Sequence, residues 1–395
     1  HYYTNKINFD EIISSPEFIK SEEPLYIVDL ADIVNKFFVW KEVMPRVQPF
    51  YAVKCNDHPV ILKLLSELGT GFDCASKGEI NRVMNLDVQS NRIIFANPTK
   101  PIAHLLHAKQ YGVYTMTYDG EYELHKIKKY FPNASLVLRI RCEAEKAQCP
   151  LGEKFGCDPI IDAPKLLKIA YDLNLNVVGI SFHVGSGCQD FPVYERAIAH
   201  SKRLFEYGET LGFKMNLLDI GGGFPGKKNS KILEVGGIIS RALNKYFPPE
   251  DNITIIAEPG RFFVASSHTL ICKVHSKREV VRENKLEKVM YFINDGVYGS
   301  FNCILYDHQA ATPQYLKENI NEKDENGNIM KYKSSIWGPT CDALDQICEE
   351  VYFPKLEIGE VIIFENMGAY TVPIASAFNG FPLPKIQFFM NKKYK

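Results

Sequence analysis

The chain has 395 residues, of which 46% are hydrophobic and 24% are charged, and its formal net charge is −1. This near-neutral balance gives no electrostatic footprint for nucleic acid or an anionic membrane, and no apolar run approaches the roughly 20 residues of a membrane-spanning helix. The ten cysteines form no CxxC pair and no His/Cys spacing typical of zinc. These properties favour a protein that acts on small molecules. Because no signal-peptide pattern is present, we expect it to be cytoplasmic with reduced thiols.

The length predicts two domains. From residue 49 to about 260, short apolar strands alternate with amphipathic helical segments such as Pro59–Leu68. The eight predicted strands are 49–54, 70–75, 92–97, 112–118, 135–141, 176–184, 216–220 and 253–258. Eight strand-helix units predict the α/β class with a TIM-like (β/α)8 barrel.

After this barrel the pattern changes to strands separated by turn signals such as Asn294-Asp-Gly296. Strands are predicted at 270–280, 289–294, 360–365 and 385–390, and Leu25–Asp29 is expected to join them, which would bring both chain ends together. The prediction is an all-β sandwich or barrel formed by 1–30 and 266–395, with the first domain at 31–265. Residues 317–333 are polar without periodicity and are expected to form a mobile surface loop.

Lys54 is the most informative residue, because it ends an apolar strand as a lone cation. Chemistry in parallel barrels takes place at the carboxyl ends of the strands, where an amine among apolar neighbours suits Schiff-base formation. The alternative is a lysine that extends into solvent. Asp73 ends the second strand, where it could cap the strand or orient Lys54.

Further polar residues fall at the other strand ends. Gly221–Gly223 follow strand seven, where barrels commonly bind phosphate through backbone N–H groups, although a tight turn is the alternative. Ser186 and Arg261 add donors, and together they fit a phosphate better than a dinucleotide. His183 could be a core histidine or a ring stacked on a flat cofactor. Glu258 could pair with Arg261 or face a pyridine nitrogen and keep it protonated.

Ordered motifs extend this pattern over nearly the whole chain. They include PFYAVKCND (49–57), GTGFDCASK (69–77), LVLRI (136–140), KFG (154–156), SFHVGSGC (181–188), LLDIGGGFPG (217–226), EPGRFFV (258–264), NDGVYGSFNCILYDH (294–308), IWGPTCDALD (336–345) and AYTVPIASAFNGF (369–381). On these motifs the chain resembles the eukaryotic ornithine decarboxylases, pyridoxal-phosphate-dependent enzymes of the alanine-racemase-like fold.

The resemblance implies that pyridoxal 5'-phosphate is bound as a Schiff base by Lys54, with Glu258 at the pyridine nitrogen and His183 stacked on the ring. Asp73 and Arg139 would organise this site. The phosphate would be bound by Ser186, Gly221, Gly222, Gly223, Arg261 and Tyr370.

The resemblance also implies a head-to-tail homodimer with shared active sites. Cys341 would direct a proton to the α-carbon, and Asp342 and Tyr298 would complete the partner's site with it. Asp307 and Asp342 would bind the distal ammonium of the substrate. The remaining implied residues are Phe378 as a pocket wall and Lys154 and Asp345 as a pair across subunits.

The implied reaction is decarboxylation of L-ornithine to putrescine and carbon dioxide. One alternative is a decarboxylase of arginine, lysine or diaminopimelate, and another is an inactive binding protein resembling antizyme inhibitor. The Asp307 and Asp342 pair favours a short diamine precursor, and the retained cofactor residues favour an enzyme. Residues 143–153 have the composition of a lid or of a plain surface loop. Residues 102–125, where animal relatives bind antizyme, leave antizyme binding open.

Overall fold

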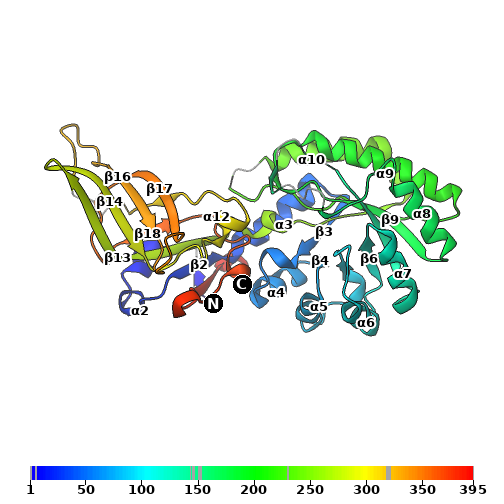
Figure 1. The fold of residues 1–395 in the computed structure, drawn as a ribbon, viewed down its shortest axis with the longest axis horizontal. Helices are drawn as coiled ribbons and strands as arrows, with labels where there is room; N and C mark the ends of the chain where they lie inside the picture. The colour runs from blue at the N-terminus through cyan, green and yellow to red at the C-terminus, as the bar shows by residue number, and fades with distance from the viewer. Residues whose placement is uncertain are drawn as a thin grey trace. The chain divides into compact units, whose positions relative to one another are not determined.

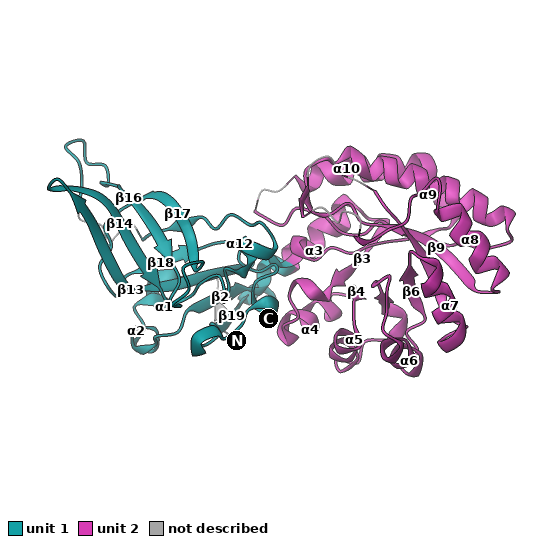
Figure 2. Ribbon diagram, viewed as in Figure 1, with its two compact units in different colours: residues 1–33, 264–395 teal, residues 34–263 magenta. Residues whose placement is uncertain are grey.

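A computed structural model describes residues 2–4, 7–142, 144, 147–149, 154–228, 231–316 and 322–394. The chain forms two compact units (Figure 2). We call residues 34–263 the barrel unit, and residues 1–33 with 264–395 the β unit. Among the described residues, no helix is both long and apolar enough to cross a membrane.

The barrel unit contains a closed sheet of eight parallel strands in the order β11-β12-β3-β4-β5-β6-β7-β9. Figure 1 labels β3, β4, β6 and β9 among them. All eight predicted strands and the barrel fold are confirmed. The strands are β3 (Val47–Ala52), β4 (Gly71–Cys74), β5 (Ile93–Phe95), β6 (Thr115–Tyr118), β7 (Ser135–Ile140), β9 (Asn176–Phe182), β11 (Leu217–Asp219) and β12 (Thr254–Ala257). Each observed strand overlaps its predicted range but differs from it at one or both ends. The difference matters most for β3, which ends at Ala52, so Lys54 lies on the following 3-10 turn η1 (Val53–Cys55).

Helices connect successive barrel strands, and local sequence signals explain where they begin. In α4, the His58 side chain accepts a hydrogen bond from the N–H of Val60, Pro59 occupies the first turn, and Ile61, Leu62 and Leu65 are buried. The helices of this unit, with α3 beginning and α11 ending in the β unit, are α3 (Leu30–Val43), α4 (Pro59–Glu67), α5 (Lys77–Met84), α6 (Ile102–Gln110), α7 (Glu121–Tyr130), α8 (Ala163–Asp172), α9 (Pro192–Thr210), α10 (Ile232–Tyr246) and α11 (Arg261–Val264).

The β unit is built on a nine-stranded mixed sheet with the main order β1-β19-β2-β13-β14-β16-β17. As predicted, β2 (Leu25–Asp29) joins this sheet, between β13 (His268–Arg282) and β19 (Lys385–Asn391). β1 (Tyr2–Thr4) pairs with β19, which confirms that both chain ends lie together. The other elements are β14 (Lys285–Ile293), β15 (Pro313–Gln314), β16 (Tyr332–Trp337), β17 (Gln346–Phe353), β18 (Val361–Phe364), α1 (Phe9–Ile13), α2 (Pro16–Lys20) and α12 (Asn302–Tyr306).

Sequence reasoning missed β16 and β17, because their burial does not follow a regular alternation of apolar and polar side chains. The predicted loop 317–333 was therefore wrong at its end, where Tyr332 begins β16; residues 317–321 lie outside the described residues. In the predicted lid 143–153, Ala147–Cys149 form β8, which pairs antiparallel with β10 (Ser186–Cys188). The rest of that segment, apart from residue 144, is also outside the described residues.

Candidate active site

Lys54 and Asp73 form an ion pair at the carboxyl ends of β3 and β4. The ammonium of Lys54 donates to Oδ2 of Asp73, whose side chain is fully buried, whereas the Lys54 side chain is 38% exposed. Oδ1 of Asp73 is buried without a hydrogen-bond partner among the described residues. A buried carboxylate thus orients a lysine that is accessible from solvent.

Glu79, which the sequence reading did not select, lies close to the same pair. Burial raises the pKa of Glu79, the N–H of Ala75 and the charge of Lys54 lower it, and the charge of Asp73 raises it. Its Oε2 accepts a hydrogen bond from the N–H of Ala75 at 2.6 Å. In the sequence, Glu79 stands three residues after the helix cap Ser76, so it resembles an ordinary capping-box residue.

Two further acids, Asp219 and Glu258, lie at the ends of the neighbouring strands β11 and β12. Burial raises the pKa of Glu258 well above its usual value, and the charges of Asp219 and Asp73 raise it further. Burial also raises the pKa of Asp219 to about 6. Asp219 accepts a 2.9 Å hydrogen bond from the N–H of Gly221, but its Oδ2 is buried without a partner in the described part of the chain. A proton on the Glu258 carboxyl is therefore favoured in the protein alone.

His183 follows β9 and is held as a neutral ring. Burial, with the nearby charges of Arg139 and Lys54, lowers the pKa of His183 well below its usual value. Its Nδ1 accepts a hydrogen bond from the N–H of Gly185 at 3.0 Å, so the neutral ring carries its proton on Nε2. A Cβ atom on Gly222 would lie 2.6 Å from that Nε2, which places the glycine loop against the imidazole.

The glycine loop has the shape of an anion cradle. Gly221 and Gly223 have φ values of +63° and +102°, and a Cβ atom on Gly221 would lie 2.1 Å from a backbone oxygen. Close by, the carbonyl of Gly223 accepts from the N–H of Cys188 at 3.2 Å, in β10. On that strand, Oγ of Ser186 accepts from Nη2 of Arg261 at 2.9 Å. Backbone N–H groups, a hydroxyl and a guanidinium thus gather as phosphate binders require.

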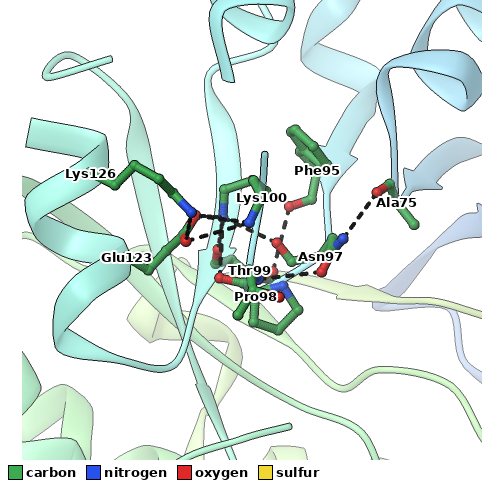
Figure 3. A network of polar contacts seen from close by, with 9 residues as sticks. Ala75, Phe95, Asn97, Pro98, Thr99, Lys100, Glu123 and Lys126 are labelled. Atoms are coloured by element: carbon green, nitrogen blue, oxygen red, sulfur yellow. Dashed lines mark hydrogen bonds and ion pairs between the residues drawn. The ribbon is translucent and has the colours of Figure 1, made fainter. Parts of the chain in front are cut away.

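A buried lysine that sequence reasoning missed connects the loops that follow β4 and β5 with β6 and α7. Figure 3 shows Lys100, whose Nζ donates to the carbonyls of Thr117 at 2.6 Å and Asn97 at 3.1 Å and pairs with Glu123 at 2.9 Å. Nδ2 of Asn97 in turn donates to the carbonyl of Ala75 at 3.2 Å. Burial lowers the pKa of Lys100 to about 8. The network supports the backbone that carries Asp73, two residues before Ala75.

The predicted substrate residues gather on loops of the β unit. The hydroxyl of Tyr298 donates to Oδ2 of Asp342, and the rings of Tyr298 and Phe378 stack with centroids 4.3 Å apart. Cys341 is exposed, and both its N–H and its Sγ lie within hydrogen-bond distance of Oδ1 of Asn379, at 3.2 Å and 3.3 Å. Hydrogen bonds from the N–H of Leu344 and from Tyr298 lower the pKa of Asp342.

Four other predicted residues have different environments. Asp345 is only 1% exposed, and its carboxylate accepts from the N–H groups of Val297 and Thr340 at 2.8 Å and 2.9 Å. Asp345 therefore anchors two loops of its own unit, although from the sequence alone it would be taken for a surface charge. Lys154 is exposed. Asp307 is buried after α12, and Tyr370 has a left-handed φ of +56°.

Comparison with known proteins agrees with this arrangement. Residues 30–265 match the model of the pyridoxal-dependent decarboxylases, pyridoxal binding domain. The chain is 46% identical to ornithine decarboxylase 2 of Drosophila melanogaster over 99% of this chain and 98% of that protein. It is 45% identical to antizyme inhibitor 2 of Xenopus laevis, over 96% and 84% of the two chains. The structure of the arginine decarboxylase of Paramecium bursaria Chlorella virus is similar with a TM-score of 0.89 and 36% identity, over 96% and 98% of the two chains.

The chain belongs to the pyridoxal-dependent decarboxylase family, and its cofactor is pyridoxal 5'-phosphate. The residues of the barrel unit fit this group. An accessible amine stands beside buried carboxylate oxygens without partners, and the glycine loop leaves no room for side chains where it meets His183 and the backbone of Glu258. The donors around Ser186 and Arg261 suit the phosphate.

Proposed function

We propose that the protein decarboxylates L-ornithine to putrescine and carbon dioxide, the first committed step of polyamine formation. The observation that carries this proposal is the group formed by Lys54, Asp73, His183 and Glu258, which a protein acting only as a binding partner would not need. The identity to a decarboxylase and to an antizyme inhibitor is nearly equal, so sequence similarity alone does not choose between them. We include a cytoplasmic location in the proposal, since all ten cysteines are thiols.

In this proposal the residues of the barrel unit hold and tune the cofactor. Lys54 would bind it covalently, and Asp73 with Glu79 would hold the ammonium of Lys54 whenever that amine is released. His183 presents a neutral, flat ring for stacking. Glu258 would face the pyridine nitrogen, and its raised pKa allows its carboxyl to donate a proton there. Bound pyridoxal phosphate supplies the electron sink for the electrons that remain when the substrate loses its carboxylate.

The phosphate of the cofactor would be bound by the glycine loop, Ser186 and Arg261, with Tyr370 as a further ligand from the β unit. Ser186 and Arg261 are already joined by hydrogen bonds of 2.9 Å and 3.3 Å, which limits their freedom before any ligand binds. This arrangement supports binding of a doubly charged group at a defined position.

The β unit would supply substrate residues both to its own site and, across a homodimer, to the partner's site. Cys341 would protonate the α-carbon in the partner's site, and the distal ammonium would be bound by Asp307 of one chain and Asp342 of the other. Phe378, stacked on Tyr298, would wall the pocket. Because Lys154 is exposed, it remains accessible for the proposed pairing with Asp345 of the other subunit, although Asp345 already binds two N–H groups of its own chain.

The first test is carbon dioxide release from ornithine, arginine and lysine, measured side by side with and without added pyridoxal phosphate. We expect cofactor-dependent release from ornithine, with putrescine as the second product. Preferential release from arginine or lysine would overturn the substrate assignment but keep the reaction class. No release from any of them by folded protein would favour a binding function of the kind named for the Xenopus relative.

Shared active sites have a separate test. Mixed dimers of Lys54→Ala and Cys341→Ala chains should regain part of the activity, because one of the two hybrid sites contains both intact residues. The control is each variant alone, at the same total concentration. If subunit exchange is demonstrated and no activity returns, the sites are not shared.

A further inference from the structure

We propose that Phe155 is a positioning residue for Arg139, and that its ring holds the guanidinium ready for the cofactor. The inference rests on the proposed assignment of Arg139 to the cofactor site. It assigns a role to a residue that neither binds the substrate nor belongs to the barrel strands.

The contact itself is direct. The guanidinium carbon of Arg139 lies 5.2 Å from the centre of the Phe155 ring, within the range of a cation–π interaction. A planar guanidinium stacks well on an aromatic face, and this contact restricts a long side chain that otherwise has many rotamers. The charge of Arg139 reaches the cofactor site, because it contributes to lowering the pKa of His183.

The backbone around Phe155 is fixed beside the end of β7. The N–H of Cys157 donates to the carbonyl of Arg139 at 3.1 Å, and the N–H of Arg141 donates to the carbonyl of Cys157 at 2.8 Å. Gly156, which precedes Cys157, has a φ of +88°, and a Cβ atom there would lie 2.8 Å from the nitrogen of Arg141. Only glycine fits this close approach, so the backbone of residues 155–157 is fixed in its position beside Arg139.

A second anchor comes from the neighbouring strand. Asp119 follows β6, and its Oδ2 accepts a hydrogen bond from the N–H of Gly156 at 2.8 Å. Burial raises the pKa of Asp119, while the bond from Gly156 and the charge of Arg139 lower it. The carboxylate therefore binds the backbone next to Phe155 and also lies within the field of Arg139. Two neighbouring strands thus fix the backbone beside Phe155. The ring contacts Arg139 and also lies 5.1 Å from Nζ of Lys154.

Loss of the ring should weaken cofactor binding without a comparable loss of folding stability. Without Phe155, Arg139 would occupy several rotamers, and the cofactor would have to select one of them. A cation–π contact of this kind corresponds to a roughly 3- to 30-fold change in a binding constant. Because a tyrosine ring offers the same face, Phe155→Tyr should retain most of the effect.

The experiment is a titration of cofactor-free protein with pyridoxal phosphate, followed by absorbance, for the wild type, Phe155→Leu, Phe155→Met and Phe155→Tyr. We expect the Leu and Met variants to bind about 3- to 30-fold more weakly and the Tyr variant to bind within about 2-fold of the wild type. The matched control is Tyr171→Leu on α8, whose ring lies 5.5 Å from Lys168, away from the candidate site residues; its affinity should not change.

A double-mutant cycle separates positioning from general damage. In an Arg139→Met background, Phe155→Leu should cause no further loss of cofactor affinity, because the cation that it positions is absent. Full additivity, or wild-type affinity in both Phe155→Leu and Phe155→Met, would overturn the proposal. The titration contains no amino acid substrate, so its result does not depend on whether the protein acts on ornithine.

Discussion

The barrel unit and the β unit present their candidate functional groups in opposite ways. In the barrel, Asp73 and Asp219 are fully buried at strand ends, and burial is the main cause that raises the pKa of Asp219 and Glu258. In the β unit, Cys341 is exposed and Phe378 is 41% exposed, and hydrogen bonds lower the pKa of Asp342.

The two units differ in which polar groups they bury. The barrel buries carboxyl groups beside the ion pair of Lys54 and Asp73, and this burial raises the pKa of Asp219 and Glu258. The β unit leaves Cys341 and Phe378 exposed, although Asp307 is buried, and it also buries the groups that hold its loops. Asp345 joins the loops that carry Tyr298 and Cys341, and Nδ2 of the buried Asn302 donates to the carbonyls of Gly299 and Thr371.

The largest effect is expected from Lys54→Ala, because it removes the reactive group of the barrel rather than a supporting contact. Turnover should fall by at least about 10³-fold, and the absorbance of the covalently bound cofactor should disappear. Lys63→Ala, at an exposed lysine of α4 paired with Glu67, is the control. A Lys54→Ala variant that stays coloured and active would falsify its assigned role.

Lys100→Met tests whether the barrel depends on buried charge pairs. The variant removes the cation that pairs with Glu123, whose side chain is only 4% exposed, and it removes the donor to three carbonyls, so the free energy of unfolding should fall by about 3 kcal/mol. Lys100→Met combined with Glu123→Leu should recover much of this loss, since neither buried charge remains. Urea unfolding measures both, with Lys126→Met as the control at the more exposed partner of Glu123. If the double variant is less stable than the single one, the pair contributes more than its desolvation cost.

Asp345→Ala tests the corresponding anchor in the β unit. Two backbone N–H groups would lose their acceptor, which should destabilise the protein by about 2 kcal/mol and disturb the loop of Cys341. We expect the rate of decarboxylation to fall while the affinity for pyridoxal phosphate stays near that of the wild type. Asp345→Asn, which keeps one acceptor oxygen, should be affected less. An equal loss of cofactor affinity would show that Asp345 of the β unit also supports cofactor binding, which the proposal assigns to the barrel unit.

A pH dependence compares one buried aspartate in each unit. Burial raises the pKa of both Asp219 and Asp295 from 3.8 to about 6. The folded state therefore binds more protons than the unfolded state between these pH values, and the stability that each group contributes below pH 4 is lost as the pH rises through 6.

Replacement by asparagine removes this dependence. Relative to the wild type, Asp219→Asn and Asp295→Asn should each become more stable as the pH rises from about 4 to about 6, as read from urea midpoints. Saturating pyridoxal phosphate should change the difference between the wild-type and Asp219→Asn profiles but not the difference between the wild-type and Asp295→Asn profiles, because only Asp219 lies beside the cofactor residues. Variant and wild-type profiles that run parallel would contradict the raised pKa values.

Local sequence patterns were sufficient to predict the barrel strands. Buried strands and amphipathic helices each have a hydrophobic pattern that is visible within a short segment. The ordered motifs likewise placed Lys54, His183, the glycine loop and Glu258 at strand ends. β16 and β17 were missed since half-exposed strands of irregular pattern carry little periodic signal. Glu79 was missed because its position after Ser76 has a purely local explanation as a helix cap.

The sequence by itself thus determined the family, the cofactor and the order of the barrel strands, all of which depend on residue types at short spacing. Only the tertiary structure decided that Lys100 is buried among carbonyl oxygens, that Asp345 binds its own loops and that Phe155 covers Arg139. Burial, charge coupling and ring contacts arise between segments that are far apart in the chain, so no local pattern contains them.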